Sequence, residues 1–359
     1  MSEPLEATIH LAFAFDVGYE VDLDRAGAML PVASGHLARR RRTPESIRYR
    51  PAPLRLALDA SGFALPGAGG DVAAGSPRAE LSLFDFGAIS LLIQIPVRTT
   101  PEGLSRVAGE LADPGPITAA ARLVLAPWLE RIRPSIVEYE LSDFSEEFVV
   151  FQLGETRADW LVENAAWVAG LVRLEPGPMG AEEVVEATRK SLSYAPNDLV
   201  VLDWAAGVVA DRDCADTIQV IEFANVQLLE FRHIDDRLDD RLDAAYKLIR
   251  PKAARRRMRD HGGALRSIRE LEIEATSLFE RADSSLKLIG DQYLARVYTL
   301  ASSRFHLDEW QRSIRRKLET VGDVYDLLVQ QAGVRRMEFL EIVVIVLIAL
   351  EIVLTIVRH

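Results

Sequence analysis

His233, Asp236 and Asp240 are the first residues that could do chemistry, because imidazole and carboxylate groups bind metal ions. In the segment FRHIDDRLDDRLD they stand at i, i+3 and i+7, so one helical face would carry all three. Arg237 and Arg241 interrupt the same segment, and opposite charges about four residues apart usually form a solvated salt-bridged face. We therefore favour a salt-bridged helix surface here and predict no metal-binding residues.

Two clusters of arginine are candidates for contacts with phosphate groups. The first comprises Arg39, Arg40, Arg41, Arg42, Arg48, Arg50 and Arg55, with Tyr49 interleaved, and the second comprises Lys252, Arg255, Arg256, Arg257 and Arg259. Each cluster could bind RNA or anionic lipid head groups. Each could equally be a solvated loop that pairs with the many acidic residues of the chain. The sequence leaves these alternatives open.

A glycine-rich stretch gives only a faint phosphate-loop pattern. Gly70 and Gly75-Ser76 have the spacing, but no lysine follows Gly75, and a strand pattern stands where a helix should begin. We read this stretch as a surface loop. The sequence shows no recognisable Ser/His/Asp, Cys/His, His-Glu-x-x-His or paired-carboxylate pattern. We accordingly predict no catalytic residues and no cofactor, and we expect a protein that is not an enzyme.

Composition limits the classes of protein further. Hydrophobic residues make up 49% of the 359-residue chain and charged residues 27%, which is typical of a folded protein. The net charge of -12 disfavours nonspecific nucleic-acid binding. The single cysteine, Cys214, and an N-terminus with acids where a signal peptide is basic indicate a cytoplasmic location for the bulk of the chain. The excess of arginine over lysine is typical of GC-rich codon usage and indicates a bacterium.

The elements that would position any site fall into two patterns. Residues 1–212 read as an α+β domain. We expect strands at 7–15, 54–58, 81–97, 147–153 and 199–204, with a bend at Phe86-Gly87, and helices at 100–112, 117–132, 158–172 and 180–192.

From Ala215 onward the spacing is helical. Apolar residues alternate at three and four positions from Ile221 to Ile249, and only Asp235 breaks this heptad seam. Pro251 ends the helix, and helical spacing resumes near Leu265. We expect residues 213–336 to form a long antiparallel, coiled-coil-like helical hairpin that serves as a stalk.

The C-terminal residues 337–357 have the length and apolar character of one transmembrane helix. Its aliphatic residues offset the insertion cost of one central acid with only a small margin. Phe339, Glu341 and Glu351 are the residues to which we assign membrane association. Glu351 either pairs with a partner helix or leans toward water. A buried helix of a soluble oligomer is the alternative to a span.

The tail pattern resembles a known family. The short sequences MEF at 337–339 and ALEIV at 349–353 are similar to the C-terminus of the "required for meiotic nuclear division" family, also called domain of unknown function 155. Phe339 replaces the family's usual tryptophan. The likeness covers about residues 80–357 and includes the helix from Gln219 to Leu242. It implies a bacterial member with one C-terminal span and no assigned enzymatic activity. Mitochondrial members are thought to tether the ribosome to the inner membrane.

Together these features predict a fold class and a function. The fold is an α+β N-terminal domain, a helical hairpin and one C-terminal transmembrane helix. The function is that of a tail-anchored, non-enzymatic scaffold at the cell membrane, whose cytoplasmic domain binds a partner. The expected partners are the membrane, a second copy of the chain or another protein. RNA is a further candidate because of the arginine clusters, and the ribosome is a candidate because of the resemblance. The alternatives are an enzyme of unrecognised type in the α+β domain and a soluble homo-oligomer with buried C-terminal helices.

Overall fold

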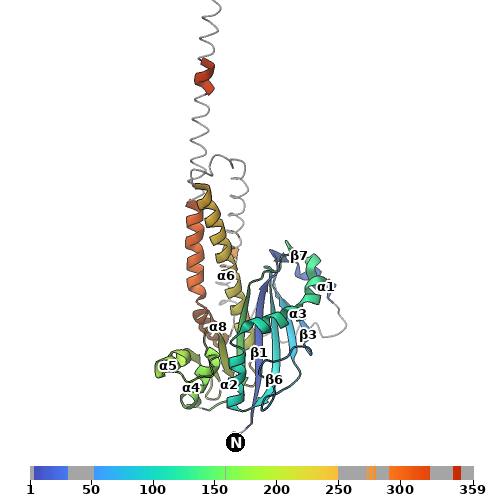
Figure 1. The fold of residues 1–359 in the computed structure, drawn as a ribbon, viewed down its shortest axis with the longest axis vertical. Helices are drawn as coiled ribbons and strands as arrows, with labels where there is room; N and C mark the ends of the chain where they lie inside the picture. Colours follow the sequence, from blue (N-terminus) through green and yellow to red (C-terminus); the bar gives the residue numbers. More distant parts are fainter. Residues whose placement is uncertain are drawn as a thin grey trace, which may run out of the picture. The chain divides into compact units, whose positions relative to one another are not determined.

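The computed structural model describes residues 4–30, 52–157, 159–249, 273, 275–277, 279, 291–323 and 343–348 (Figure 1). It divides into two compact units. We call residues 1–233 with 278–309 the sheet unit, and residues 234–277 with 310–359 the helical unit.

The sheet unit contains one large mixed β-sheet. Its strands are β1 (Leu5–Asp16), β3 (Leu54–Asp59), β4 (Ala73–Ala74), β5 (Arg78–Leu83), β6 (Ala88–Thr99), β8 (Ser145–Leu153), β9 (Ser191–Leu192), β10 (Leu199–Leu202) and β11 (Ala206–Ala210). The order across the sheet is β3-β5-β6-β1-β8-β11-β10-β9, and β4 also pairs with β6. Among the strands that the structure describes, β8 and β11 form the one parallel pair. A separate two-stranded sheet joins β2 (Glu20–Val21) to β7 (Ile136–Val137).

Helices cover the sheet. They are α1 (Leu23–Met29), α2 (Pro101–Glu110), α3 (Pro114–Ile132), the short 3₁₀ helix η1 (Arg133–Ser135), α4 (Trp160–Arg173), α5 (Ala181–Arg189), α6 (Ala215–Ile249) and α8 (Gln292–Arg304). Residues 307–323 and 343–348 are also helical. Thr100 caps α2 by accepting a hydrogen bond from the Gly103 amide, and Pro101 follows as the first helical residue.

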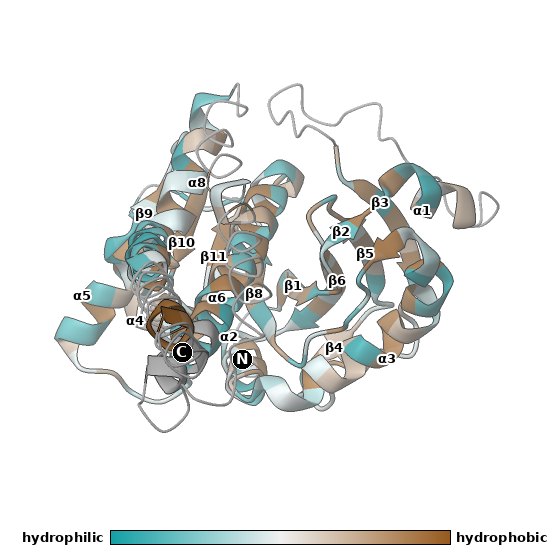
Figure 2. Cartoon of the chain, turned by 90° about the horizontal axis from the view of Figure 1, so that it is seen from above, coloured by the Kyte–Doolittle hydropathy of each residue, from teal (hydrophilic) through white to brown (hydrophobic). Residues whose placement is uncertain are grey.

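Strand β1 lies in the middle of the sheet, and its side chains contribute to both faces of the sheet. Ile9, Leu11, Phe13 and Phe15 are at most 1% exposed and belong to the same core cluster as α2, α3 and α4. The alternate residues of β1 point to the opposite face because strand side chains alternate. Hydrophobic residues also run along β6, which pairs with β1, and along β5, which pairs with β6 (Figure 2).

Helix α6 covers part of that opposite face. Ser82 Oγ of β5 donates a hydrogen bond of 3.0 Å to the buried Glu222 of α6, and Arg55 of β3 lies 3.5 Å from the same carboxylate. Asn225 of α6 donates to the carbonyl of Glu146 on β8. The first half of α6 is therefore a core helix of the sheet unit, whereas the heptad spacing predicts a stalk.

Helix α8 runs beside α6 in the same direction. Tyr293, near the start of α8, bonds with Thr217 at the start of α6. Further along both helices, Tyr298 donates a 2.6 Å hydrogen bond to Gln227 and packs against Phe223. The predicted antiparallel pairing is therefore wrong for these two helices. The heptad spacing is correct as a sign of a long helix, but spacing alone does not fix the direction of a neighbour.

In the helical unit, the second half of α6 pairs with residues 310–323. Lys317 Nζ lies 2.8 Å from Asp235 and 2.7 Å from Asp239, and Leu238 and Ile314 are fully buried. Asp235 interrupts the apolar heptad seam, and its carboxylate forms an ion pair with Lys317.

The C-terminal part of the fold prediction is also contradicted. Of the predicted span at 337–357, only residues 343–348 are described, and they form a largely exposed helical turn. Among the described residues, we find no helix with the length and apolar character needed to cross a membrane. This finding overturns the predicted transmembrane helix, the tail anchor and the location at the cell membrane. Glu341 and Glu351, which interrupt the apolar run, leave only a small margin for insertion.

Candidate ligand-binding groove

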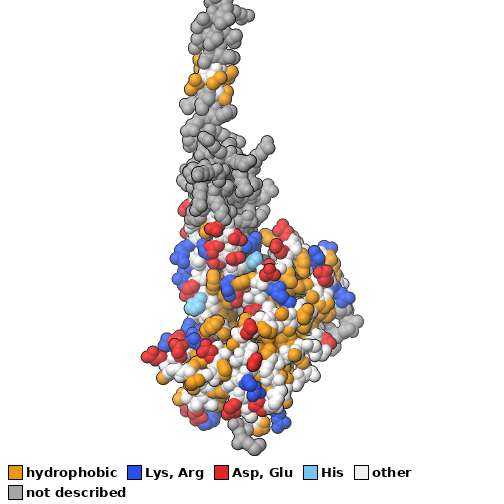
Figure 3. Space-filling view, viewed as in Figure 1, with side chains coloured by type: hydrophobic (Ala, Val, Ile, Leu, Met, Phe, Trp, Pro, Cys, Tyr) orange, Lys and Arg blue, Asp and Glu red, His pale blue; other side chains and the backbone are white. Residues whose placement is uncertain are grey.

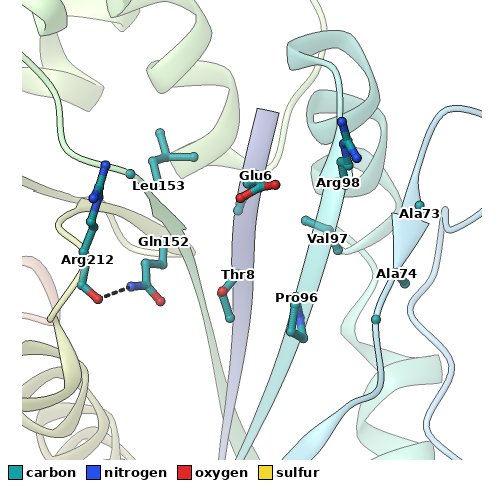
Figure 4. Close-up of a pocket in the computed structure, with 13 residues that line it drawn as sticks. Glu6, Thr8, Ala73, Ala74, Pro96, Val97, Arg98, Gln152, Leu153 and Arg212 are labelled. Atoms are coloured by element: carbon teal, nitrogen blue, oxygen red, sulfur yellow. Dashed lines mark hydrogen bonds between the residues drawn. The ribbon is translucent and has the colours of Figure 1, made fainter. Parts of the chain in front are cut away.

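One end of the large sheet carries an open groove of about 870 Å³. Its walls and floor come from the first residues of β1, the short strand β4, the ends of β6 and β8, and Arg212 after β11 (Figure 4). The groove lies on the same face as the alternate residues of β1, so helix α6 leaves this end of the face uncovered. All of the lining residues belong to the sheet unit.

The floor is a row of three side chains on adjacent strands. Thr8 of β1 stands directly opposite Pro96 of β6 and Gln152 of β8. Since register partners in antiparallel strands present their side chains to the same face, these three side chains share one surface. The carbonyl of Pro96 accepts a 2.7 Å hydrogen bond from the Gly75 amide, which holds β4 as a side wall.

Three charged side chains surround the floor. Glu6 and Arg98 are register partners on β1 and β6, and each lies two residues along its strand from Thr8 or Pro96 of the floor row. Arg212 lies on the far side, beyond β8 (Figure 4). Its side chain is 78% exposed and lies 3.9 Å from Glu155. From one rim to the other the groove is therefore basic, acidic and basic.

Gln152 connects the groove floor by hydrogen bonds to β1 and to the backbone that follows β11. Its amide nitrogen donates hydrogen bonds to the carbonyls of Asp211, at 3.0 Å, and Arg212, at 3.4 Å. Its amide oxygen lies 2.9 Å from Nε2 of His10. The backbone that carries Arg212 is thus held in place by a side chain of the groove floor.

His10 is the buried partner in this hydrogen bond. Burial lowers the pKa of His10, although the hydrogen bond to Gln152 opposes that effect. The neutral ring donates from Nε2 to Gln152, which leaves Nδ1 as an acceptor. That atom is buried and has no hydrogen-bond partner among the described residues. His10 is therefore a neutral, positioning group and not a general acid at neutral pH.

Comparison with known proteins identifies the family of this chain. The family described as "Uncharacterized protein MJ0711, N-terminal domain" matches residues 6–217, which is more than half of the chain. The chain belongs to this family. An uncharacterized protein MJ0711 of the archaeon Methanocaldococcus jannaschii is 25% identical over 225 residues, covering 62% of this chain and 69% of the relative. No solved structure matches. The matched range contains every lining residue of the groove.

The MJ0711 family replaces the resemblance to the "required for meiotic nuclear division" family, which is wrong. The relative found is archaeal, so the expected bacterial membership has no support. The misleading signal was the tail, because short runs of isoleucine, valine and leucine recur in unrelated chains. The family match instead rests on the sheet unit and the start of α6.

The predicted contact residues fall outside the described residues. This holds for Arg39, Arg40, Arg41, Arg42, Arg48, Arg50, Arg255, Arg256 and Arg257, and for Phe339, Glu341 and Glu351. Arg55, at the end of the first arginine-rich stretch, is described, and it forms a 2.6 Å ion pair with Glu80 in addition to its contact with Glu222. Arg55 is thus part of the packing between the sheet and α6.

The remaining sequence candidates do not form a site. His233 lies 3.9 Å from Asp16, whereas Asp236 and Asp240 are exposed. Within the described ranges, no group of three or more His, Cys, Asp or Glu side chains is arranged to hold a metal ion. Burial raises the pKa of Cys214 to about 12, so its thiol is protonated and a poor nucleophile.

The glycine-rich stretch 70–75 leads into β4 and then β5, as a surface loop should. Sequence reasoning missed the groove itself, because its three floor residues are far apart in the chain. The available signal was the polar residues Glu6, Thr8 and His10 at alternate positions of a largely apolar strand.

Proposed function

We propose that the sheet unit is a protein-binding module and that the chain acts as a scaffold that captures an extended segment of a partner protein. The observation that carries this proposal is the open groove at the end of the sheet, with a floor of Thr8, Pro96 and Gln152 and charged groups at its rims.

The form of the groove favours a chain segment over a small molecule. Small-molecule sites usually enclose 70–90% or more of their ligand in a mostly apolar cavity. This groove is open along one side and crosses four strands of the sheet. An extended peptide needs only one face buried, and its side chains can meet the charges at the rims.

The groove is also held in shape before any ligand arrives. Gln152 bonds to both His10 and the 211–212 backbone, and β4 is bonded to β6 through Gly75 and Pro96. Preorganisation of this kind lowers the entropic cost of binding.

Selection from a displayed library of random ten-residue peptides tests the proposal. The full-length wild-type chain should enrich peptides, and Thr8→Trp, which fills the floor, should lose at least tenfold of the binding. Ala74→Trp places the same bulk on the side wall and should have the same effect even if Thr8→Trp fails to fold. Val162→Trp on α4 is the matched control, because Val162 is 79% exposed and outside the groove.

Enrichment that persists unchanged in folded Thr8→Trp and Ala74→Trp would show that the groove is not the binding surface. No enrichment by the wild-type chain would overturn the proposal as a whole.

A further inference from the structure

The order of charges across the groove points to a specific class of ligand. We propose that the groove selects an extended peptide segment with an acidic, a basic and an acidic side chain at positions i, i+2 and i+4. This inference rests on the proposed function and adds the recognition rule.

The distances between strands set the spacing of the charges. Arg98 on β6 and Glu6 on β1 are register partners on neighbouring strands. Arg212 follows β11, which lies two strands beyond β1 in the sheet order. With neighbouring strands about 4.8 Å apart, the two arginines stand roughly 14 Å apart across the sheet, with the acid between them.

An extended peptide has a matching repeat. Its residues rise about 3.3 Å each and alternate sides, so i and i+4 face the same way roughly 13 Å apart. A segment that crosses the strands can therefore place one acid at each arginine and a basic residue at Glu6. Thr8, in the middle of the floor, presents a hydroxyl that can bond to the peptide backbone.

The charges of the groove are available for exchange. The side chain of Arg212 is mostly exposed, and its 3.9 Å contact with Glu155 is long. Glu6 and Arg98 are also exposed. Exposed ion pairs contribute about 0–1 kcal/mol. Replacing such contacts by equivalent contacts to a ligand costs little, while the ligand gains three charge-assisted interactions at fixed spacing.

The central acid disfavours a continuous polyanion such as RNA. Glu6 stands between the two arginines, so consecutive phosphates would meet a carboxylate in the middle of the groove. On the face seen in Figure 3, acidic and basic side chains are interspersed and the described surface presents no continuous basic area. Direct phosphate neutralisation needs such an area. The arrangement therefore favours a peptide of alternating charge.

Three synthetic peptides of equal length test the rule. The matched peptide is acetyl-Gly-Asp-Thr-Lys-Thr-Asp-Gly amide, the inverted peptide is acetyl-Gly-Lys-Thr-Asp-Thr-Lys-Gly amide, and a third carries the matched composition with adjacent charges. Fluorescence anisotropy with the full-length chain should give at least tenfold tighter binding of the matched peptide than of the other two. The preference should shrink at high salt because exposed charges are screened.

Charge reversal in the groove supplies the decisive variants. Glu6→Lys should remove the preference for the central lysine and favour a matched peptide with aspartate at that position. Arg98→Glu should weaken the matched peptide at least fivefold. Arg131→Glu is the control, because Arg131 is an exposed arginine of α3 outside the groove.

The outcomes separate this inference from the proposed function. If the matched and inverted peptides bind equally while Thr8→Trp still abolishes peptide capture, the charge rule is wrong and the groove remains a peptide site. If a random single-stranded RNA competes more strongly than the matched peptide, the groove recognises a polyanion and the inference is overturned. If no peptide binds the wild-type chain, both proposals fail together.

Discussion

Nε2 of His10 lies 2.9 Å from Oε1 of Gln152, although 142 positions separate the two residues in the chain. The contact joins the central strand β1 to β8 and, through the amide nitrogen of Gln152, to the backbone of Asp211 and Arg212. A single amide side chain therefore fixes three segments that form the groove. This arrangement explains how the sheet accommodates the buried His10 ring on its central strand.

Gln152→Ala should destabilise the sheet unit by about 1–3 kcal/mol, because it leaves the buried His10 ring without its bonded partner. Urea unfolding followed by circular dichroism measures this change. Gln94→Ala is the matched control, since Gln94 stands opposite His10 on β6 and should cost less. Equal losses for the two variants would mean that the bond to His10 contributes nothing specific.

Acidification should destabilise the fold through His10. Its pKa in the folded chain is lowered from 6.5 by burial, so the unfolded chain binds a proton that the folded chain rejects. The stability that depends on a neutral His10 is then fully present above pH 6.5 and falls as the pH drops below it. His10→Gln should flatten this part of the pH profile in urea titrations. His306→Gln, at a ring that is 69% exposed, should leave the profile as in the wild type.

Glu146 should give the opposite slope. Burial raises its pKa from 4.5 to about 7, against the opposing charge of Arg232. The folded chain holds this proton more tightly than the unfolded chain, so the stability contributed by Glu146 is fully present below pH 4.5 and is lost as the pH rises toward 7. At about 1.36 kcal/mol per pKa unit, the loss over this window is roughly 3 kcal/mol.

Glu146→Gln should remove that loss, measured as the difference in unfolding free energy between pH 4.5 and pH 7. Glu130→Gln changes a carboxylate that is 69% exposed and serves as the control. A wild-type profile that rises with pH in parallel with Glu146→Gln would contradict the assignment.

Gly87→Ala should destabilise the β5–β6 hairpin by about 2–3 kcal/mol or more. Gly87 has a φ of +90°, and an added Cβ would stand 1.8 Å from the carbonyl oxygen of Gly18. Thermal unfolding compares it with Gly62→Ala, where an added Cβ meets no atom within 4 Å. If the two variants melt at the same temperature, the close approach of Gly18 does not constrain the turn.

Local patterns in the sequence predicted many of the elements correctly. The apolar run 81–97 with a bend at Phe86-Gly87 corresponds to β5 and β6, with the turn at Gly87. The helical spacing at 158–172 and 180–192 corresponds to α4 and α5. These elements were predictable because burial on one side imposes a local period on the sequence.

The assembly of these elements could not be predicted in the same way. Strand β1 pairs with β6 and β8, and nothing in a local window encodes partners so distant. Helix α6 has a coiled-coil spacing, yet buried polar residues such as Glu222 and Asn225 bond to the sheet. A heptad pattern reports that one stripe is buried but does not report what buries it. The groove depends on the pairing of distant strands and on the place of α6 over the sheet. It was missed because local patterns predict neither.

The central place of β1 has a consequence for synthesis of the chain. The ribosome makes this strand before both of its sheet neighbours, which end at Thr99 and Leu153. At about 5–20 residues per second, the strand waits from several seconds to half a minute for its second partner. Both edges of this largely apolar strand are open to other nascent chains until Thr99 is made, and the edge that pairs with β8 stays open until Leu153. A chain stopped before Leu153 should therefore aggregate, and binding of a chaperone to β1 (Leu5–Asp16) should precede folding.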